Sequence, residues 1–313
     1  MNRILLGTGL VAMGAALFGT LSYLARSAAE AGIEAPPFVA WRALIGAGAL
    51  FLASIVVGGM AGQPFAHRIP SLGGLTHDRR VALIAAALCG ALLNIAVFAA
   101  FLKTTIAIAL ICFYTFPAMV TLAAVPLYGE RLTPLRIGAL VLSSIGLVVV
   151  VLAPAFGDAG MVVDPVGVGL ALVAAVFQAS FVLIAGRGFR PMTNLHVSTF
   201  VIAAAFVVSA PLALLLGEFA GLLRPLTDAA PWPWILAGGL IGAAIPTTAF
   251  ITGIGIIGPS RAAILMTIEP LIGVALAALL LNEQPTLVQL LGGATVLAGA
   301  AILQVAPRTA PVA

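Results

Sequence analysis

A glutamate lies in the middle of a long apolar run, directly before a proline. In "ILMTIEPLIG" (264–273), Glu269 is the only ionisable residue of a run that begins near Arg261. A charged side chain at the centre of a bilayer costs roughly 2.5–3.5 kcal/mol on insertion scales, so such residues are candidates for function. Pro270 donates no backbone hydrogen bond, which loosens a helix and frees a carbonyl group. A substrate amine or a coupling proton could bind here; alternatively, a neighbouring polar group satisfies a structural acid.

Other polar side chains lie within the apolar runs and are candidates for substrate binding with Glu269. They are Asn94, Gln178, Tyr114, Thr247, Thr248, Tyr23 and Arg42. Asn94, Gln178 and Thr247 lie far from the ends of their runs, as a site near the bilayer midplane requires. The amides could instead form hydrogen bonds between helices, and the threonines could bond their own backbone. Arg42, near the outer end of its run, could attract an anionic group or pair with Glu34.

The remaining reactive residues do not form a catalytic or metal-binding pattern. The three histidines, His67, His77 and His196, include no HExxH motif, and no run contains paired aspartates. No GxxxxGK[ST] sequence is present, so ATP is not expected to be the direct energy source. Cys89 and Cys112 lie in apolar runs and are expected to pack as small apolar residues. We therefore expect no enzyme activity, no cofactor and no metal site.

The composition is that of a protein with several membrane spans. Of the 313 residues, 62% are hydrophobic and 8% are charged, whereas soluble domains have about 25% charged residues. The mean hydropathy is +1.22. The net charge is only +4, and the basic residues lie between apolar runs rather than in one stripe. We therefore expect no nucleic-acid partner. We expect membrane lipid to surround the protein.

These apolar runs predict the elements that must position the candidate residues. A bilayer core of roughly 30 Å requires about 20 helical residues. The runs are 4–25, 38–58, 81–102, 105–127, 134–153, 166–186, 195–216, 232–256, 260–281 and 286–305. Their length, without period-2 alternation, excludes a barrel and predicts an all-α polytopic membrane protein with ten transmembrane helices.

The distribution of basic residues predicts the orientation of these helices. If the amino terminus is cytoplasmic, ten of the 14 Lys and Arg residues lie on the cytoplasmic side. These ten are Arg3, Arg68, Arg79, Arg80, Arg131, Arg136, Arg187, Arg190, Arg261 and Arg308. The other four are Arg26, Arg42, Lys103 and Arg224. The positive-inside rule therefore predicts that both termini are cytoplasmic.

The chain resembles itself at a shift of 153 residues. "FYTFPAMVTLAAVPLYGERLT" (113–133) aligns with "MTIEPLIGVALAALLLNEQPT" (266–286), which superimposes Pro117 on Pro270 and Glu130 on Glu283. Chance similarity between two apolar segments is the alternative. Residues 1–154 and 155–313 are thus predicted to be two five-helix repeats. An odd number of spans per repeat makes them inverted, an architecture typical of secondary transporters.

The "GERLT" and "NEQPT" joints, with "PPFVAWRALIGA" (36–47), resemble the paired EamA repeats of the drug/metabolite transporter superfamily. The second repeat departs from the first at Gln284–Pro285, which aligns with Arg131–Leu132. Within the superfamily, the chain looks most like bacterial amino-acid exporters of the YddG type. The resemblance implies two inverted five-helix repeats in the bacterial inner membrane, and export or exchange of small metabolites.

The sequence thus favours a secondary transporter, with amino acids as the expected substrates. An exporter of drugs or of other hydrophobic or cationic metabolites is the alternative, and a channel is a weaker one because no selectivity-filter motif is present. Coupling to a proton or substrate gradient, and a monomer or homodimer, are both compatible with the sequence.

Overall fold

The computed structural model describes residues 3–152, 163–280 and 286–305, and every regular element in these ranges is a helix. In the first half these are α1 (Arg3–Gly19), α2 (Leu21–Glu30), α3 (Ala35–Met60), α4 (Phe65–Arg68), α5 (His77–Phe101), α6 (Ile106–Phe113), α7 (Phe116–Tyr128) and α8 (Pro134–Leu152). In the second half they are α9 (Pro165–Gly186), α10 (Asn194–Leu215), α11 (Phe219–Thr227), α12 (Trp232–Gly239), η2 (Leu240–Ala244), α13 (Ile245–Ile257), α14 (Pro259–Leu265), η3 (Met266–Ile268), α15 (Glu269–Leu280) and α16 (Leu287–Val305).

The predicted all-α membrane fold is confirmed. Within the described ranges, 9 helical segments are long and apolar enough to cross a membrane, and the tenth predicted span is the shorter apolar helix Leu287–Leu303. The short helices α4 and α11 were not predicted, and α5 begins at His77 rather than at residue 81. The predicted span ends at residues 153 and 281, together with Glu283, Gln284–Pro285 and Arg308, lie outside the described residues.

Four of the predicted spans are helical throughout the described residues but contain a local change of hydrogen-bonding pattern, which we call a break. Span 1 breaks at Thr20, between α1 and α2, where the Thr20 hydroxyl donates to the Leu17 carbonyl at 2.7 Å. Span 4 breaks between α6 and α7, span 8 contains the π-helical turn η2, and span 9 contains the 3-10 turn η3 just before Pro270. Proline removes a donor at the last of these breaks. The sequence predicted only the break at Pro270.

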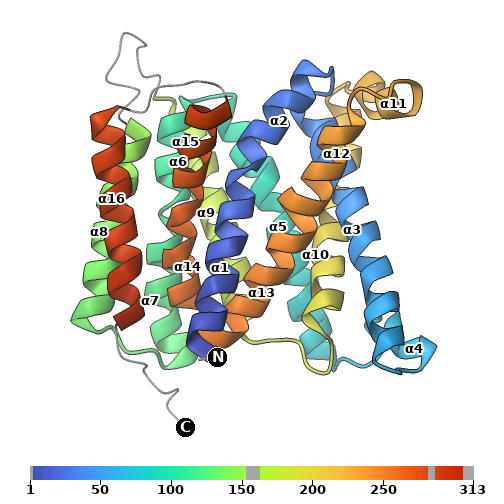
Figure 1. The fold of residues 1–313 in the computed structure, drawn as a ribbon, viewed down its shortest axis with the longest axis horizontal. Helices are drawn as coiled ribbons and strands as arrows, with labels where there is room; N and C mark the ends of the chain where they lie inside the picture. Colours follow the sequence, from blue (N-terminus) through green and yellow to red (C-terminus); the bar gives the residue numbers. More distant parts are fainter. Residues whose placement is uncertain (1–2, 153–162, 281–285, 306–313) are drawn as a thin grey trace.

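Each predicted span of the first half packs against a span of the second half. The main pairs are α1 with α13, α3 with α10, α5 with α9, α7 with α14 and α8 with α16. Figure 1 shows α8 and α16 side by side at one edge of the bundle. If each span is replaced by the span at the same position in the other half, the same set of pairs results. The pair α1 with α13, for example, becomes the pair α9 with α5, which is also in the set. The spans of one half are therefore packed mainly against the other half.

The α8–α16 pair crosses at glycines. A Cβ built on Gly146 would lie 2.7 Å from the carbonyl oxygen of Gly292, and one built on Gly292 would lie 2.9 Å from that of Gly146. Real Cβ atoms do not approach a carbonyl oxygen so closely, so the two backbones touch only because both residues are glycine. Such contacts between small residues are the usual basis of helix association in membranes.

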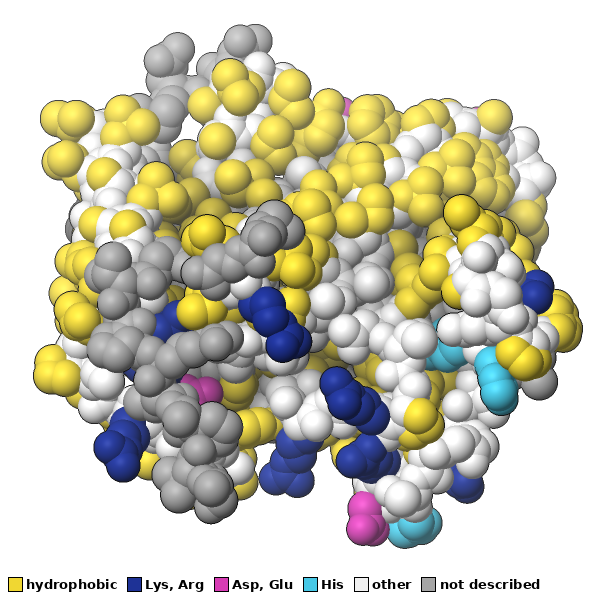
Figure 2. Space-filling model, turned by 60° about the horizontal axis from the view of Figure 1, so that its bottom comes forward, with side chains coloured by type: hydrophobic (Ala, Val, Ile, Leu, Met, Phe, Trp, Pro, Cys, Tyr) yellow, Lys and Arg dark blue, Asp and Glu magenta, His cyan; other side chains and the backbone are white. Residues whose placement is uncertain are grey.

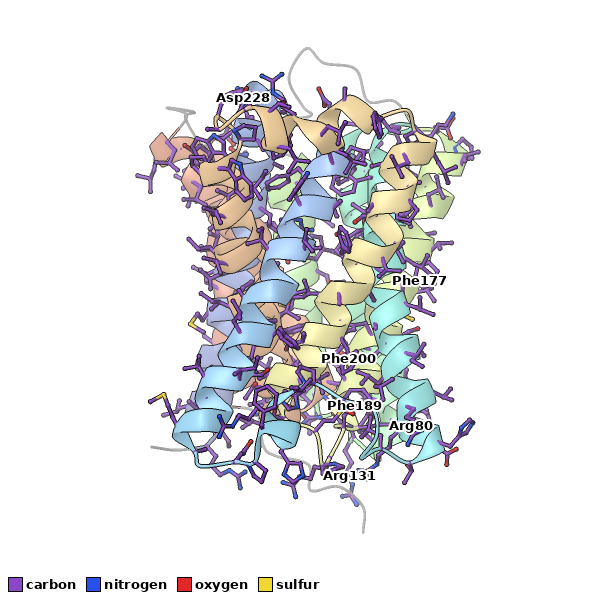
Figure 3. The ribbon with its side chains drawn as sticks, turned by 90° about the vertical axis from the view of Figure 1, so that its right-hand side faces the viewer. Arg80, Arg131, Phe177, Phe189, Phe200 and Asp228 are labelled. Atoms are coloured by element: carbon purple, nitrogen blue, oxygen red, sulfur yellow. The ribbon has the colours of Figure 1, made fainter. Side chains whose placement is uncertain are left out.

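Basic side chains gather on one face of the bundle. This amino-terminal face, where α1 begins, carries most of the Lys and Arg side chains in Figure 2, while the sides visible there are largely hydrophobic. In Figure 3, Arg80 and Arg131 lie at this end and Asp228 lies at the other. The helices thus run between two polar faces through an apolar belt, as membrane spans do.

One arginine of the amino-terminal face is buried in an ion pair. Nη1 of Arg136, on α8, lies 2.8 Å from Oε2 of Glu130, and the two side chains are only 5% and 13% exposed. A Cβ built on Gly258, which has φ +86, would lie 3.2 Å from Oε1 of Glu130. Glu130 belongs to the "GERLT" joint between α7 and α8. The structure shows that its carboxylate packs against the α13–α14 joint of the second half.

Removing this arginine should therefore destabilise the protein. Arg136→Leu leaves the Glu130 carboxylate buried without its partner, and breaking a buried pair in this way costs roughly 3–5 kcal/mol. Thermal unfolding of the purified protein in detergent should show a lower midpoint than for Arg131→Leu, which removes an exposed arginine of the same loop. Adding Glu130→Gln to Arg136→Leu should recover part of the loss. Equal midpoints for the two single variants would contradict the prediction.

Candidate substrate cavity

A cavity of about 180 Å³ lies between the two halves. Its walls come from α1, α2, α3, α5, α6 and α7 of the first half and from α9, α10, η2, α13, η3 and α15 of the second. Much of the wall is aromatic: Phe18, Phe113, Phe116, Phe181 and Phe250. Among the described residues that line the cavity, only Glu269 and Arg42 are ionisable.

Glu269 lies on one wall, at the break in span 9. It is the first residue of α15 and follows η3, so the helix changes its hydrogen-bonding pattern at the carboxylate. A side-chain hydrogen bond joins Glu269 to Tyr114, which is buried at the end of α6. The carboxylate is thus held in place on one side and lines the cavity on the other.

The break in span 1 lies directly against the break in span 9. A Cβ built on Gly19 would lie 2.6 Å from the carbonyl oxygen of Glu269 and 2.7 Å from Cβ of Ile272. The end of α1 and the beginning of α15 are therefore in direct backbone contact beside the carboxylate.

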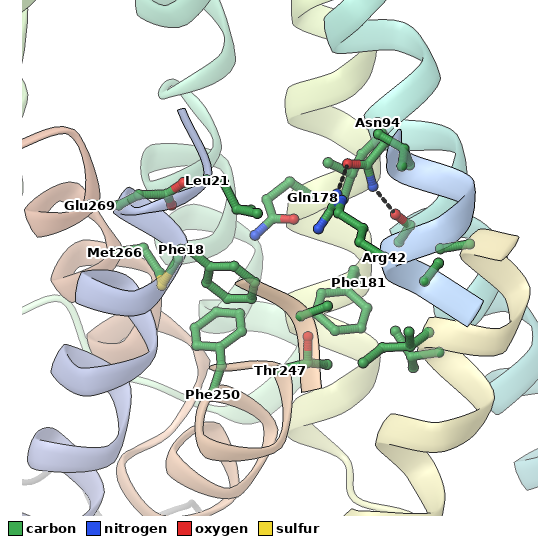
Figure 4. A pocket seen from close by; sticks show the side chains of 18 of the residues that line it. Phe18, Leu21, Arg42, Asn94, Gln178, Phe181, Thr247, Phe250, Met266 and Glu269 are labelled. Carbon is green, nitrogen blue, oxygen red and sulfur yellow. Dashed lines mark hydrogen bonds between the residues drawn. The ribbon is translucent and has the colours of Figure 1, made fainter. Parts of the chain in front are cut away.

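Arg42 lies on the opposite wall (Figure 4). Its Nη2 donates to Oδ1 of Asn94 at 3.3 Å, and its Nη1 donates to the Gly242 carbonyl at 3.5 Å. Nδ2 of Asn94 donates in turn to the Gly90 carbonyl at 2.9 Å, so the amide is fixed with its oxygen toward the guanidinium. The sequence offered Glu34 as a possible partner for Arg42, but these bonds direct the guanidinium into the cavity.

Two more of the predicted residues line the cavity between these walls. In Figure 4 the Gln178 amide lies between Glu269 and Arg42, and Thr247 lies below with the phenylalanines. Gln178 is 9% exposed and comes from the middle of α9. Glu269, Asn94, Gln178, Thr247 and Arg42, which are far apart in the sequence, thus lie around one cavity.

The other three predicted residues do not line it. Tyr114 reaches the site only through its bond to Glu269. The Thr248 hydroxyl donates to the Ala244 carbonyl at 2.9 Å, the backbone bond foreseen as the alternative. The Tyr23 ring packs edge-on against Trp234, with centroids 6.1 Å apart. The phenylalanines that line the cavity were not predicted from the sequence. An apolar residue within an apolar run does not differ from its neighbours, so its type does not show that it faces a cavity.

The arrangement can hold a small molecule without covalent chemistry. A carboxylate and a guanidinium face the same cavity from opposite halves, with an amide between them and aromatic rings around them. Among the described residues, no cluster of three or more His, Cys, Asp or Glu could hold a metal ion. A lining of this kind can recognise a small molecule by charge, hydrogen bonds and apolar contact.

Comparison with known proteins gives a family match over both halves. The model of the EamA-like transporter family matches residues 5–152 and again 165–305. An uncharacterized transporter of Synechocystis sp. is 28% identical over 215 residues, which are 67% of this chain and 62% of that protein's length. The chain therefore covers less than two thirds of that relative.

A solved structure shares the fold. A protein crystal structure superimposes with a TM-score of 0.66, covering 95% of this chain and 96% of that one at 19% sequence identity. A likeness at this identity concerns the arrangement of the helices alone.

Proposed function

Because the chain belongs to the EamA-like transporter family, we propose that it is a secondary transporter that exports or exchanges amino acids across the bacterial inner membrane by alternating access. One observation carries the proposal: a carboxylate, Glu269, lies at a helix break in a cavity between the two halves. Transporters of this class bind substrates near the midplane, where discontinuous helices present polar groups to the cavity. A buried carboxylate in such a place suits the ammonium group of an amino acid.

The proposal treats residues 1–154 and 155–313 as two inverted repeats. Two observations support it: the family model matches twice, once in each half, and the set of helix pairs is unchanged when the halves are exchanged. Rocking of one repeat against the other would open the cavity to each face in turn.

A second candidate function is the export of hydrophobic cations. The five phenylalanines around the cavity favour it, because a cation can lie against an aromatic face at a gain of about 0.5–2 kcal/mol. Glu269 would then neutralise the bound cation.

Uptake into proteoliposomes tests the proposed function. Purified protein should take up labelled amino acids at a saturable rate, and a proton gradient or internal amino acid should accelerate that uptake. A flux that does not saturate would indicate a channel. Transport of organic cations without transport of any of the twenty amino acids would support the second candidate.

The proposed orientation predicts which side of the membrane each loop occupies. Reporters placed after Arg308 and in the loop 59–80 should report the cytoplasm, and a reporter in 217–231 should report the periplasm. If the two loop reporters appeared on the same side, the five-plus-five inverted arrangement would be wrong.

A further inference from the structure

We propose that Arg42, oriented by Asn94, is a second anchor that binds a carboxylate of the substrate, so that the cavity selects zwitterions over simple cations. This inference rests on the proposed transport function and specifies its substrate class. Glu269 alone cannot distinguish an amino acid from an amine of the same shape. A cationic side chain on the opposite wall can make this distinction, because it binds the carboxylate that the amine lacks.

The first support is the state of the Arg42 guanidinium. Its hydrogen bonds go to neutral oxygens, the Asn94 amide and the Gly242 carbonyl, and at 3.3 Å and 3.5 Å both are long. A charge-assisted bond from a guanidinium to a carboxylate is typically about 2.7–2.9 Å. The structure thus gives Arg42 weak bonds that hold its direction, while its charge faces the cavity.

The second support is the chemistry of the surrounding wall. Glu269 is the only acidic side chain among the described residues that line the cavity, and it is held by Tyr114 on the other side. Guanidinium matches a carboxylate in planarity and in the spacing of its donors, which favours a two-point bond. The Gln178 amide lies between the two charged groups, where it can meet the polar backbone of a bound amino acid (Figure 4).

Asn94 acts as a positioning residue. Its Nδ2 is fixed by the Gly90 carbonyl at 2.9 Å, so its oxygen is presented to Arg42 without adding a negative charge. An aspartate at position 94 would place a carboxylate where the guanidinium already points. Such a group would occupy Arg42 as a substrate carboxylate does, and the cavity would then favour a cation.

Three compounds with one side chain test this: L-leucine, L-leucinamide, which lacks the carboxylate, and N-acetyl-L-leucine, which lacks the ammonium group. Their affinities can be measured by ligand-dependent thermal stabilisation of the purified protein. Wild type should bind L-leucine about 10- to 100-fold more tightly than L-leucinamide, because only L-leucine has a carboxylate that can form charge-assisted hydrogen bonds with Arg42. N-acetyl-L-leucine should lose affinity because it cannot pair with Glu269.

Variants separate the role of Arg42 from a loss of folding. Arg42→Gln should abolish the preference for L-leucine over L-leucinamide, and Arg42→Lys should retain part of it. Asn94→Asp should reverse the preference. Arg26→Gln, which removes a cation that is 58% exposed on α2, should keep the wild-type ratio. The ratio is measured within one folded protein, so a general loss of stability does not imitate the expected result.

The possible failures are distinguishable. If Arg42→Gln and Asn94→Asp keep the wild-type ratio, or if wild type binds L-leucinamide as tightly as L-leucine, Arg42 is not an anchor. The transport proposal would stand in that case. If L-leucine does not bind while other amino acids are transported, the inference fails for substrates with apolar side chains. If no amino acid is transported, both proposals fail.

Discussion

Replacing Glu269 with glutamine should lower amino-acid uptake by about 10- to 100-fold. Glutamine has the same shape and can keep a hydrogen bond to Tyr114, so the fold around the break in span 9 should survive. The substitution removes the charge that would pair with the substrate ammonium, and a hydrogen bond to a charged group contributes about 1.5–3 kcal/mol.

Initial rates of uptake in proteoliposomes, with equal amounts of reconstituted protein, measure this effect. Glu30→Gln is the matched control, because it removes a carboxylate whose side chain is 68% exposed on α2. A Glu269→Gln protein with wild-type rates would show that the carboxylate serves the packing of span 9. Loss of activity together with a lower unfolding midpoint would point to the same structural role.

Replacing Gly19 with alanine should impair both stability and transport. The added Cβ would lie 2.6 Å from the Glu269 carbonyl oxygen, which is backbone and cannot turn away. The α1–α2 break and the beginning of α15 would have to move apart, and overpacking of this kind typically costs about 1–3 kcal/mol. Because the shift occurs at the backbone of Glu269, which carries the carboxylate, uptake should fall further than stability alone explains.

Gly9→Ala provides the control on the same helix. A Cβ built on Gly9 meets nothing within 4 Å, so this substitution changes the helix propensity of α1 without touching a neighbour. Unfolding midpoints and uptake rates of the two variants should differ clearly. Identical behaviour would mean that the contact between the two breaks is not a constraint on the transporter.

Most of the fold could be predicted from the sequence, because span length and composition are set by the thickness and polarity of the bilayer. The family was predicted from the "GERLT" and "NEQPT" joints and from "PPFVAWRALIGA", and the match to residues 5–152 and 165–305 confirms it. The helix breaks were harder to predict. Pro270 predicts a break because proline donates no backbone hydrogen bond. Thr20 is an ordinary residue in an apolar run, and neither its hydroxyl bond to Leu17 nor the contact of Gly19 with the Glu269 carbonyl can be read from the sequence.

The cavity was predictable only where a polar residue stood out. Glu269, Asn94 and Gln178 contrast with apolar neighbours, and all three line the cavity. Arg42 was placed near the outer end of its span by counting along the chain, which gives depth in the membrane but not direction around the helix. Only the bonds to Asn94 and the Gly242 carbonyl reveal the direction of its side chain. Phe250 and the other phenylalanines are apolar residues among apolar neighbours, so their position in the cavity wall could not be predicted from the sequence.

The pairing of spans across the two halves also affects how the protein is made. Helix α1 (Arg3–Gly19) packs against α13 (Ile245–Ile257). The first span to be synthesised therefore cannot form its main helix contact until the eighth span has been synthesised. At about 5–20 residues per second, this delay is on the order of tens of seconds. During that interval Arg42 and Asn94 are in the membrane without the Gly242 carbonyl or the rest of the cavity. Until the second half arrives, the first half must hold the Arg42 guanidinium in the membrane without its bond to the Gly242 carbonyl, and the Asn94 amide is the partner that the first half supplies.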